Sequence, residues 1–243
     1  MEMTMNIIKT WLGGVPLMIA FKNGVSAAAK TGTVLLYHGL GVCKQANEKE
    51  LVSIANQGIL AVGVDNFGHG ERRFHDFDDR FSCYNPNFDF ELFSAVRSSA
   101  SEVPGIIDSL IGAFDVNPGK IGICGISMGG HIAYKALLND RRIKVAVPII
   151  GSPVWKAFYE ESPALFIDKF YPCALLSQTA GADDIVPPND TRAFHEKLKK
   201  YYSKKPHMQN YVEFAGAGHM LPEKDWNVLW ENLLNWFEEH LVK

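Results

Sequence analysis

A serine in the setting of a nucleophile lies near the middle of this 243-residue chain. Ser127 is the central residue of a GxSxG sequence that follows the apolar run 120–124 and precedes the helix-like stretch 128–138. A serine at a sharp strand-to-helix turn exposes its Oγ, and the helix N-terminus beside it favours developing negative charge. The pattern predicts a nucleophilic serine, with a serine that only caps the helix as the alternative.

A nucleophilic serine needs a base, an acid that orients the base, and N–H donors for an oxyanion. His219 follows the apolar run 211–214 at the end of a small-residue turn and is the candidate base. Asp183 and Asp184 follow the apolar run 173–178, and both are candidates for the acid. Serine, aspartate and histidine in this order are typical of α/β proteins that carry out acyl transfer.

Backbone N–H groups are the expected oxyanion donors, because such donors need no particular side chain. The turn 39–41 has the sequence Gly-Leu-Gly and follows the apolar run 33–38. Its N–H groups are free of side-chain crowding, so this turn is the candidate for the donors.

Elements that could position these residues alternate along the chain from residue 33 onward. Short, continuous apolar runs, such as 33–38, 59–64 and 144–150, alternate with stretches of helical spacing. Continuous rather than alternating hydrophobicity indicates parallel strands that are covered on both faces. In such a sheet the functional loops lie beyond the carboxyl ends of the strands, which is where the serine, aspartate and histidine fall.

Other segments refine this architecture. The apolar segments 7–12 and 17–21 flank a Gly-Gly-Val-Pro sequence and predict an antiparallel hairpin. Residues 71–87 are charged and irregular and predict a long loop, and Pro104 predicts a kink or a break within the helical stretch 88–114. We therefore expect one α/β domain over residues 1–243, with a mostly parallel central sheet, helices on both faces and an N-terminal antiparallel hairpin.

Five motifs follow one another between residues 38 and 219: HGLG (38–41), DNFGHGERR (65–73), GISMGG (125–130), DDIVPP (183–188) and GAGH (216–219). In this order they resemble the motifs of the α/β-hydrolase superfamily, and in particular those of small esterases related to dienelactone hydrolases and to the catalytic domains of prolyl oligopeptidases. The resemblance implies the α/β-hydrolase fold and a serine-hydrolase mechanism. Dienelactone hydrolases proper have a cysteine at the elbow, so Ser127 argues against that particular activity.

The resemblance also implies roles for single residues. Ser127 matches the nucleophile and His219 the general base. Asp183 matches the acid, because a Val-Pro pair ends four positions later, as in the usual D-x-x-V-P pattern. The glycine that usually stands three residues before this aspartate is displaced to Gly181, which keeps Asp184 open as the acid.

Two backbone groups complete the set that the resemblance implies. The N–H groups of Leu40 and Met128 match the oxyanion donors of the family.

A short cap-like segment is expected at about 152–172, between the serine and the acid. It contains seven aromatic or leucine side chains, among them Trp155 and Phe158, which could line an acyl or alcohol pocket. The simpler interpretation is one amphipathic helix packed on the sheet. Ile185, close to the expected acid, is a third candidate for substrate binding. Only 56 residues separate Ser127 from Asp183, so the cap is short and suits small esters better than long-chain lipids.

The remaining histidines are expected to be structural. His38 precedes the oxyanion turn and should orient it, His69 lies in a turn, and His131 should pack below the elbow. His75, His195, His207 and His240 fall in polar stretches, and we expect them to be solvated.

Composition excludes several classes of protein. The formal net charge is −3 with 47% hydrophobic residues, which gives no general attraction to nucleic acid or to an anionic membrane. The four cysteines lack metal-ligand spacing, and no GxGxxG, P-loop or HExxH motif occurs, so we expect neither a metal nor another cofactor. The N-terminal residues lack the pattern of a signal peptide, which favours a cytoplasmic location. Nothing in the sequence indicates the oligomeric state.

We therefore expect a serine carboxylesterase whose partner is a small-molecule ester. Three alternatives stay open: a peptidase of the prolyl-oligopeptidase type, an acyltransferase, and a non-enzymatic ligand-binding sensor on a hydrolase fold.

Overall fold

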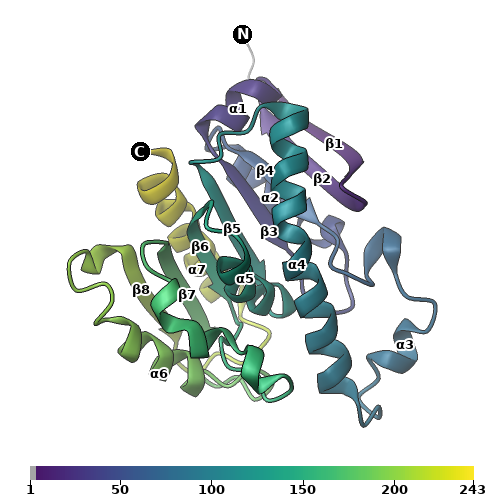
Figure 1. The fold of residues 1–243 in the computed structure, drawn as a ribbon, viewed down its shortest axis with the longest axis vertical. Coiled ribbons are helices and arrows are strands. Elements are labelled where there is room, and N and C mark those ends of the chain that lie inside the picture. The colour runs from purple at the N-terminus through teal and green to yellow at the C-terminus, as the bar shows by residue number, and fades with distance from the viewer. Residues whose placement is uncertain (1–3) are drawn as a thin grey trace.

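A computed structural model describes residues 4–243 of the protein, and one eight-stranded sheet forms its centre (Figure 1). The strands lie in the order β1-β2-β4-β3-β5-β6-β7-β8. Strands β3 to β8 are parallel to one another, whereas β2 is antiparallel to both β1 and β4. Their bounds are β1 Met5–Leu12, β2 Val15–Lys22, β3 Thr33–Tyr37, β4 Leu60–Val64, β5 Ile121–Ile126, β6 Ile143–Ile149, β7 Ala174–Ala180 and β8 Gln209–Phe214.

Helices cover both faces of this sheet. In the view of Figure 1, α4 and α5 lie in front of the sheet and α7 lies behind it. The α-helices are α1 Val25–Thr31, α2 Glu48–Ala55, α3 Phe77–Arg80, α4 Phe88–Phe114, α5 Met128–Asn139, α6 Asn189–Leu198 and α7 Glu223–Phe237. Shorter helical turns occupy Lys44–Asn47, Gly70–Arg72, Tyr159–Glu161, Pro163–Lys169, Pro206–Met208 and Glu238–Val242.

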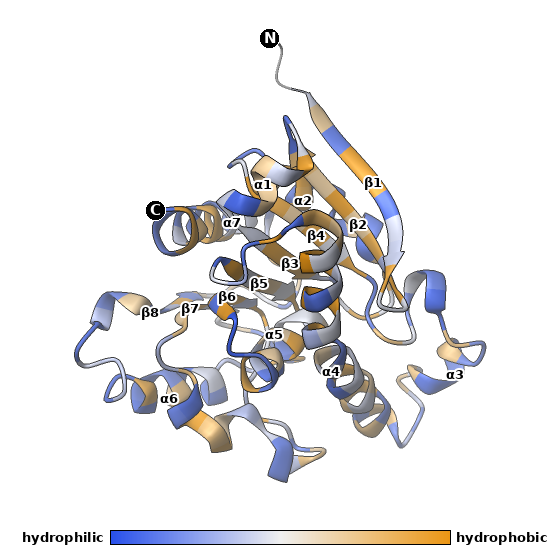
Figure 2. Ribbon diagram, turned by 45° about the horizontal axis from the view of Figure 1, so that its top comes forward, coloured by the Kyte–Doolittle hydropathy of each residue, from blue (hydrophilic) through white to orange (hydrophobic). Residues whose placement is uncertain are grey.

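The core consists of two apolar layers, one on each face of the sheet. Alternate residues of a strand point to opposite faces, so in β3 Leu35 packs in one layer and Leu36 in the other. Helices α1, α4, α5 and α6 supply the first layer, and α2 and α7 supply the second. Figure 2 shows β2, β3 and β4 as mostly hydrophobic, as expected for strands covered on both faces, whereas the edge strand β1 alternates. The predicted mostly parallel sheet is confirmed.

The N-terminal hairpin is also confirmed. Strands β1 and β2 pair in antiparallel register from Leu12 opposite Val15 outwards. The two intervening residues, Gly13 and Gly14, have φ of +59° and +78°, the left-handed conformation that a tight two-residue hairpin turn requires at both positions.

The order of the strands reverses next to β3. The chain passes from β3 outwards to β4, then crosses back to place β5 on the other side of β3. Loops that follow β3 and β5 therefore leave the sheet side by side, which is the position where α/β proteins bind ligands. The loops after β7 and β8 leave at the same edge, because these strands are parallel to β5.

Helix α4 runs without a break through Pro104, so the predicted division into two helices is wrong. Proline lacks the N–H that would bond to the carbonyl four residues earlier, here that of Ala100. The Asn139 side chain of α5 donates to this carbonyl instead, at 2.8 Å. The lost backbone hydrogen bond is thus replaced by one from the neighbouring helix.

The segment between β6 and β7 contains no amphipathic helix, so the interpretation of residues 152–172 as one such helix is wrong. It forms the 3-10 turns at 159–161 and 163–169. Ser162 fixes the fold of this segment, because its Oγ accepts a hydrogen bond from the Trp155 N–H at 2.9 Å and donates one to the Trp155 carbonyl at 3.1 Å.

Candidate active site

Ser127 lies at the turn between β5 and α5 with φ of +55° and ψ of −112°. This conformation is costly for a residue with a side chain, so the surrounding backbone must hold it in place. The Ser127 N–H donates to the Ile149 carbonyl at 2.8 Å, and its own carbonyl accepts from the Gly130 N–H at 2.8 Å. The sharp turn predicted from the GxSxG sequence is confirmed.

Two glycines allow this turn to form. A Cβ at Gly125 would lie 2.2 Å from the carbonyl oxygen of Gly129, and a Cβ at Gly129 would lie 2.2 Å from that of Tyr37. Both distances are far below van der Waals contact, so no other residue fits without moving the backbone. The start of α5 is therefore held directly against the ends of β5 and β3.

A continuous chain of hydrogen bonds leads from this serine to a buried carboxylate. The Ser127 Oγ lies 3.0 Å from Nε2 of His219, and Nδ1 of His219 lies 2.7 Å from Oδ2 of Asp183. The other carboxylate oxygen, Oδ1, accepts the N–H groups of Ile185 and Val186, both at 2.9 Å. With all its hydrogen bonds made, the Asp183 side chain is fully buried, and it orients an imidazole whose side chain is 15% exposed.

The structure therefore brings together Ser127, Asp183 and His219, as the order of the residues predicts. Asp184, the alternative acid, is exposed and forms no hydrogen bond with His219. The loops that carry Asp183 and His219 are tied to each other, because the Ala182 N–H donates to the Ala217 carbonyl at 2.8 Å.

The turn after β3 lies beside the serine. A Cβ at Gly39 would lie 3.9 Å from Cβ of Ser127, and the Leu40 N–H donates to no backbone acceptor among residues 4–243. Met128 is the first residue of α5, where helical N–H groups have no partner within the helix. Both residues line one cavity with Ser127.

His38 holds this turn in place, in the orienting role predicted for it. Its Nδ1–H donates to the Gly39 carbonyl at 2.7 Å, and its Nε2 accepts the Asn66 N–H at 3.0 Å. Burial lowers the pKa of His38 to about 4, so the ring is neutral near pH 7, and both of its nitrogens are already hydrogen-bonded to the backbone.

A buried ion pair supports the loops on this side of the sheet. Lys44, after the oxyanion turn, donates to Asp65 at 2.7 Å and to Glu71 at 2.5 Å. The Lys44 and Asp65 side chains are both fully buried. Burial acts to raise the pKa of Asp65, but hydrogen bonds from Lys44 and from backbone N–H groups outweigh it and leave this pKa below its ordinary value. The carboxylate is therefore charged and fixes the two loops to each other.

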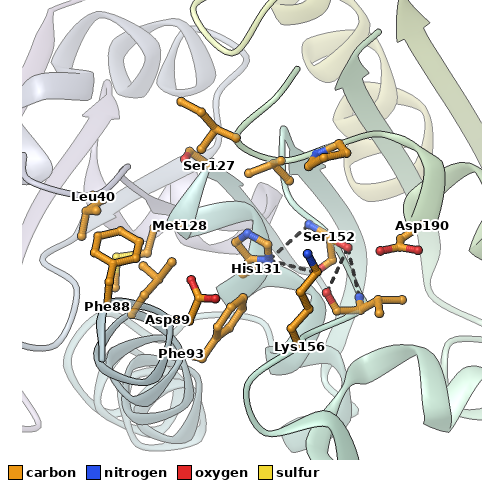
Figure 3. A pocket seen from close by; sticks show the side chains of 15 residues that line it. Leu40, Phe88, Asp89, Phe93, Ser127, Met128, His131, Ser152, Lys156 and Asp190 are labelled. Carbon is orange, nitrogen blue, oxygen red and sulfur yellow. Dashed lines mark hydrogen bonds between the residues drawn. The ribbon is translucent and has the colours of Figure 1, made fainter. Parts of the chain in front are cut away.

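A cavity of about 220 Å³ opens beside Ser127 (Figure 3). One side of it is mostly apolar and comes from the start of α4, the turn after β3 and the start of α5: Leu40, Phe88, Leu92, Phe93 and Met128, with Asp89 beside the two phenylalanines. The other side is more polar and carries His131, Ser152, Lys156 and Asp190. Ile185, one of the three expected substrate contacts, lies at the rim with 68% of its surface exposed.

Trp155 and Phe158, the other two expected contacts, do not line this cavity. Trp155 is fully buried in the core with its ring 5.1 Å from that of Phe93. Phe158 packs 4.9 Å from the ring of Phe90, beneath the guanidinium of Arg97. Both aromatic side chains pack against residues of α4, and Trp155 supports Phe93 of the pocket wall from behind.

Sequence reasoning missed most of the wall. Phe88 and Leu92 stand four residues apart near the start of α4, a spacing that places both on one face of the helix and could have revealed them. His131 was expected to pack below the elbow, and it does lie one turn after Ser127, but it also meets the cavity. Neither Ser152 nor Lys156 carries a sequence signal, since they lie in an irregular segment.

Among residues 4–243, no three histidine, cysteine or acidic side chains gather in a way that could hold a metal ion. Over the same range, no helix combines the length and the apolar character needed to cross a membrane.

The sheet order, the strained serine and the hydrogen-bonded histidine and aspartate define an α/β-hydrolase. Comparison with known families gives a narrower result: the chain matches the Dienelactone hydrolase family over residues 102–241, more than half of its length. The protein belongs to this family and is a hydrolase.

Individual relatives agree with this assignment. The chain is 26% identical over 241 residues to a Bacillus subtilis (strain 168) protein named "Putative esterase YitV", covering 86% of this chain and 89% of the relative. Among solved structures, TT1662 from Thermus thermophilus superposes with a TM-score of 0.80 at 22% identity, over 97% of this chain and 99% of that one. A structure titled "Putative Dienelactone Hydrolase" from Klebsiella pneumoniae has a TM-score of 0.75 at 16% identity, over 98% and 100% of the two chains. At these identities the two structures share the fold.

Proposed function

We propose that the protein is a serine carboxylesterase that cleaves small or medium-sized carboxylic esters through an acyl-enzyme on Ser127. The observation that carries this proposal is the unbroken set of hydrogen bonds from Ser127 through His219 to Asp183, at 3.0 and 2.7 Å. A serine hydroxyl is a weak nucleophile on its own and becomes reactive when an oriented base removes its proton.

In the proposed mechanism, Nε2 of His219 takes the Ser127 proton as Oγ attacks the ester carbonyl. Asp183 accepts a hydrogen bond from Nδ1–H, which keeps the neutral ring in the correct tautomer and stabilises the cation that then forms. The N–H groups of Leu40 and Met128 hold the oxyanion of the tetrahedral intermediate.

The second half of the reaction uses the same groups. His219 returns its proton to the leaving alcohol, which departs and leaves an ester bond between the acyl group and Ser127. A water molecule then gives a proton to His219 and attacks the acyl carbonyl. Collapse of this second intermediate breaks the bond to Oγ, which takes the proton back from His219, so the carboxylic acid is released and the serine hydroxyl restored.

The size of the cavity supports small or medium substrates. About 220 Å³ beside Ser127 accommodates a short acyl or alcohol group, and the apolar side formed by Phe88, Leu92 and Phe93 favours a hydrocarbon portion. A dissolved small-molecule ester is the proposed partner, with no requirement for nucleic acid or a membrane, and the proposed location is the cytoplasm.

Replacement of Ser127 tests the proposal. Ser127→Ala is expected to abolish hydrolysis of p-nitrophenyl acetate while circular dichroism and the Tm stay close to those of the wild type. Ser101→Ala is the matched control, because Ser101 is an exposed serine on α4 that bonds only to a carbonyl of its own helix. Normal hydrolysis by the Ser127 variant would refute the assignment.

Three further measurements separate the proposal from its rivals. A fluorophosphonate should label Ser127 in the folded protein, whereas a ligand-binding sensor would not react. Faster cleavage of prolyl or aminoacyl p-nitroanilides than of p-nitrophenyl esters would instead indicate a peptidase. If an added alcohol captured most of the acyl group as a new ester, the protein would be an acyltransferase.

A further inference from the structure

His131 is a second histidine that meets the cavity beside Ser127. It lies one helical turn after the serine on α5, and residues at this spacing share one face of a helix. The residue is only 5% exposed, yet it lines the cavity together with Ser127 and Met128. The mechanism proposed above does not use it.

The orientation of the His131 ring is fixed by its Nδ1. This atom lies 2.9 Å from the Ser152 carbonyl oxygen and 3.2 Å from the Ser152 nitrogen. The shorter contact is to the acceptor, so we assign the proton to Nδ1, which donates to this carbonyl. The Phe93 ring packs edge to face against the imidazole at 5.2 Å, which leaves little freedom for the ring to turn.

The other ring nitrogen, Nε2, then carries a lone pair and no proton. It forms no hydrogen bond with any group of residues 4–243, and Figure 3 shows it turned away from Ser152, toward the side of the pocket where Ser127 and Met128 lie. Burial lowers the pKa of His131 to about 4, so the ring is neutral near pH 7 and Nε2 stays an acceptor.

An acceptor without a partner in an almost buried position distinguishes between ligands. A hydrocarbon group placed against Nε2 displaces water and leaves the lone pair unsatisfied, which is unfavourable. A hydroxyl or amide N–H placed there restores the hydrogen bond. Sites with such a group reject analogues that lack the matching polar atom more strongly than they reject a change of one methyl group.

We propose that His131 is a specificity-determining residue whose Nε2 accepts a hydrogen bond from a hydroxyl or amide N–H of the substrate, close to the scissile ester. This inference rests on the proposed esterase function and narrows it from esters in general to esters with a donor group near the reacting carbonyl. The donor can belong to the acyl or to the alcohol portion, since both meet at Ser127.

Two pairs of nearly isosteric esters test the proposal. Ethyl lactate and ethyl isobutyrate differ by a hydroxyl in place of a methyl group on the acyl side, and 2-hydroxyethyl acetate and propyl acetate place the hydroxyl on the alcohol side. For each pair, the ratio of kcat/KM for the hydroxylated ester to that for the alkyl ester is divided by the ratio of their hydroxide-catalysed rates. This correction removes the intrinsic reactivity of the esters.

In the wild-type enzyme we expect the corrected ratio to be about five or more in one of the pairs, because one neutral hydrogen bond stabilises the transition state by an amount that gives about this factor in rate. The pair that shows the preference identifies the side that carries the donor. Corrected ratios near unity in both pairs would overturn the proposal without any variant.

Two variants separate contact with the substrate from support of the loop. His131→Asn keeps an amide near the position of Nδ1, able to bond to Ser152, and lacks the atom that faces the pocket. We expect it to lose the preference, because its kcat/KM for the hydroxylated ester falls several-fold more than its kcat/KM for the alkyl ester. His131→Gln places an amide near the position of Nε2 and should keep most of the preference. Equal losses on both esters of a pair would mean that His131 only supports the loop.

The proposed function and this inference fail in different ways. If the folded wild type hydrolyses none of the four esters in a Ser127-dependent manner, the esterase proposal is overturned and this inference with it. If it hydrolyses them but His131→Asn leaves the corrected ratios unchanged, the esterase proposal stands and the role of His131 is refuted.

Discussion

Substitution of Asp183 by asparagine changes one atom of the proposed catalytic group. Oδ1 of Asp183 accepts two backbone N–H groups at 2.9 Å, and an asparagine carbonyl can keep both bonds. The asparagine NH₂ then replaces Oδ2 and faces Nδ1 of His219, which lies 2.7 Å from Oδ2 in the wild type. The opposite orientation of the amide would set its NH₂ against the two backbone donors, so it is disfavoured.

The expected loss follows from the tautomer of the imidazole. Facing a donor, Nδ1 must present a lone pair, so the proton moves to Nε2. Nε2 can then no longer accept the Ser127 proton, although it lies only 3.0 Å from Oγ. A histidine held in the wrong tautomer lowers kcat by about 10⁴-fold, which corresponds to about 5.4 kcal/mol of transition-state stabilisation.

The assay is the steady-state hydrolysis of p-nitrophenyl acetate by Asp183→Asn and by the matched control Asp184→Asn. Asp184 is exposed and makes no hydrogen bond to His219, so its variant should stay within about twofold of the wild type. Urea denaturation of both variants checks that the fold is kept. The reasoning is refuted if Asp184→Asn loses more activity than Asp183→Asn, or if Asp183→Asn retains a tenth or more of the wild-type kcat.

Two predictions concern stability. Asn139→Ala is expected to lower the free energy of unfolding by about 1 kcal/mol in the wild type, because the Ala100 carbonyl loses its donor. The same change should cost almost nothing in a Pro104→Ala background, where residue 104 regains its N–H, and a urea double-mutant cycle that shows additivity would contradict this. Burial lowers the pKa of His195 from 6.5 to about 3, so the folded protein holds this ring neutral, and stability is full above pH 6.5 and falls as the pH drops toward 3. Between pH 6.5 and 5 this residue lowers the free energy of unfolding by up to about 2 kcal/mol. In urea titrations His195→Gln should therefore lose less stability than the wild type over this pH range. If both proteins lost the same amount, the role of His195 would be contradicted.

Much of the fold was predictable because its signals are local. Continuous apolar runs mark the buried parallel strands, and two glycines mark the turn of the N-terminal hairpin. Helix α1 was not predicted, since it has only seven residues and buries only Ala28 and Ala29. The sequence left a kink and a break open at Pro104, and the Asn139 side chain that bonds to the Ala100 carbonyl lies far away in the sequence.

The catalytic residues were easier to predict than the walls of the pocket. Ser127, Asp183 and His219 follow β5, β7 and β8, and parallel strands bring the loops after them to the same edge of the sheet. The burial of Trp155 depends instead on two hydrogen bonds between the Ser162 side chain and the Trp155 backbone. The spacing of apolar residues in the sequence does not reveal such bonds.

His195, which was expected to be solvated, shows how a polar stretch can mislead. It is 1% exposed and bonds to Ser177 at 2.7 Å. Most of the surrounding stretch is polar, but Thr191 and Leu198 lie four and three residues away on the same buried face of α6, and the adjacent Phe194 is buried as well. Helical spacing, rather than local polarity, carried the correct signal.

The backbone contacts beneath Ser127 divide the site into positions with very different tolerance to mutation. Gly125 and Gly129 leave no space for a Cβ, so the frame that aims the serine allows no variation. Lys156 and Ile185, by contrast, are exposed residues on irregular segments and are free to change. Random libraries at such wall positions should therefore yield many folded enzymes with new ester preferences. The same division lets descendants of one ancestral enzyme diverge in substrate while their chemistry stays the same.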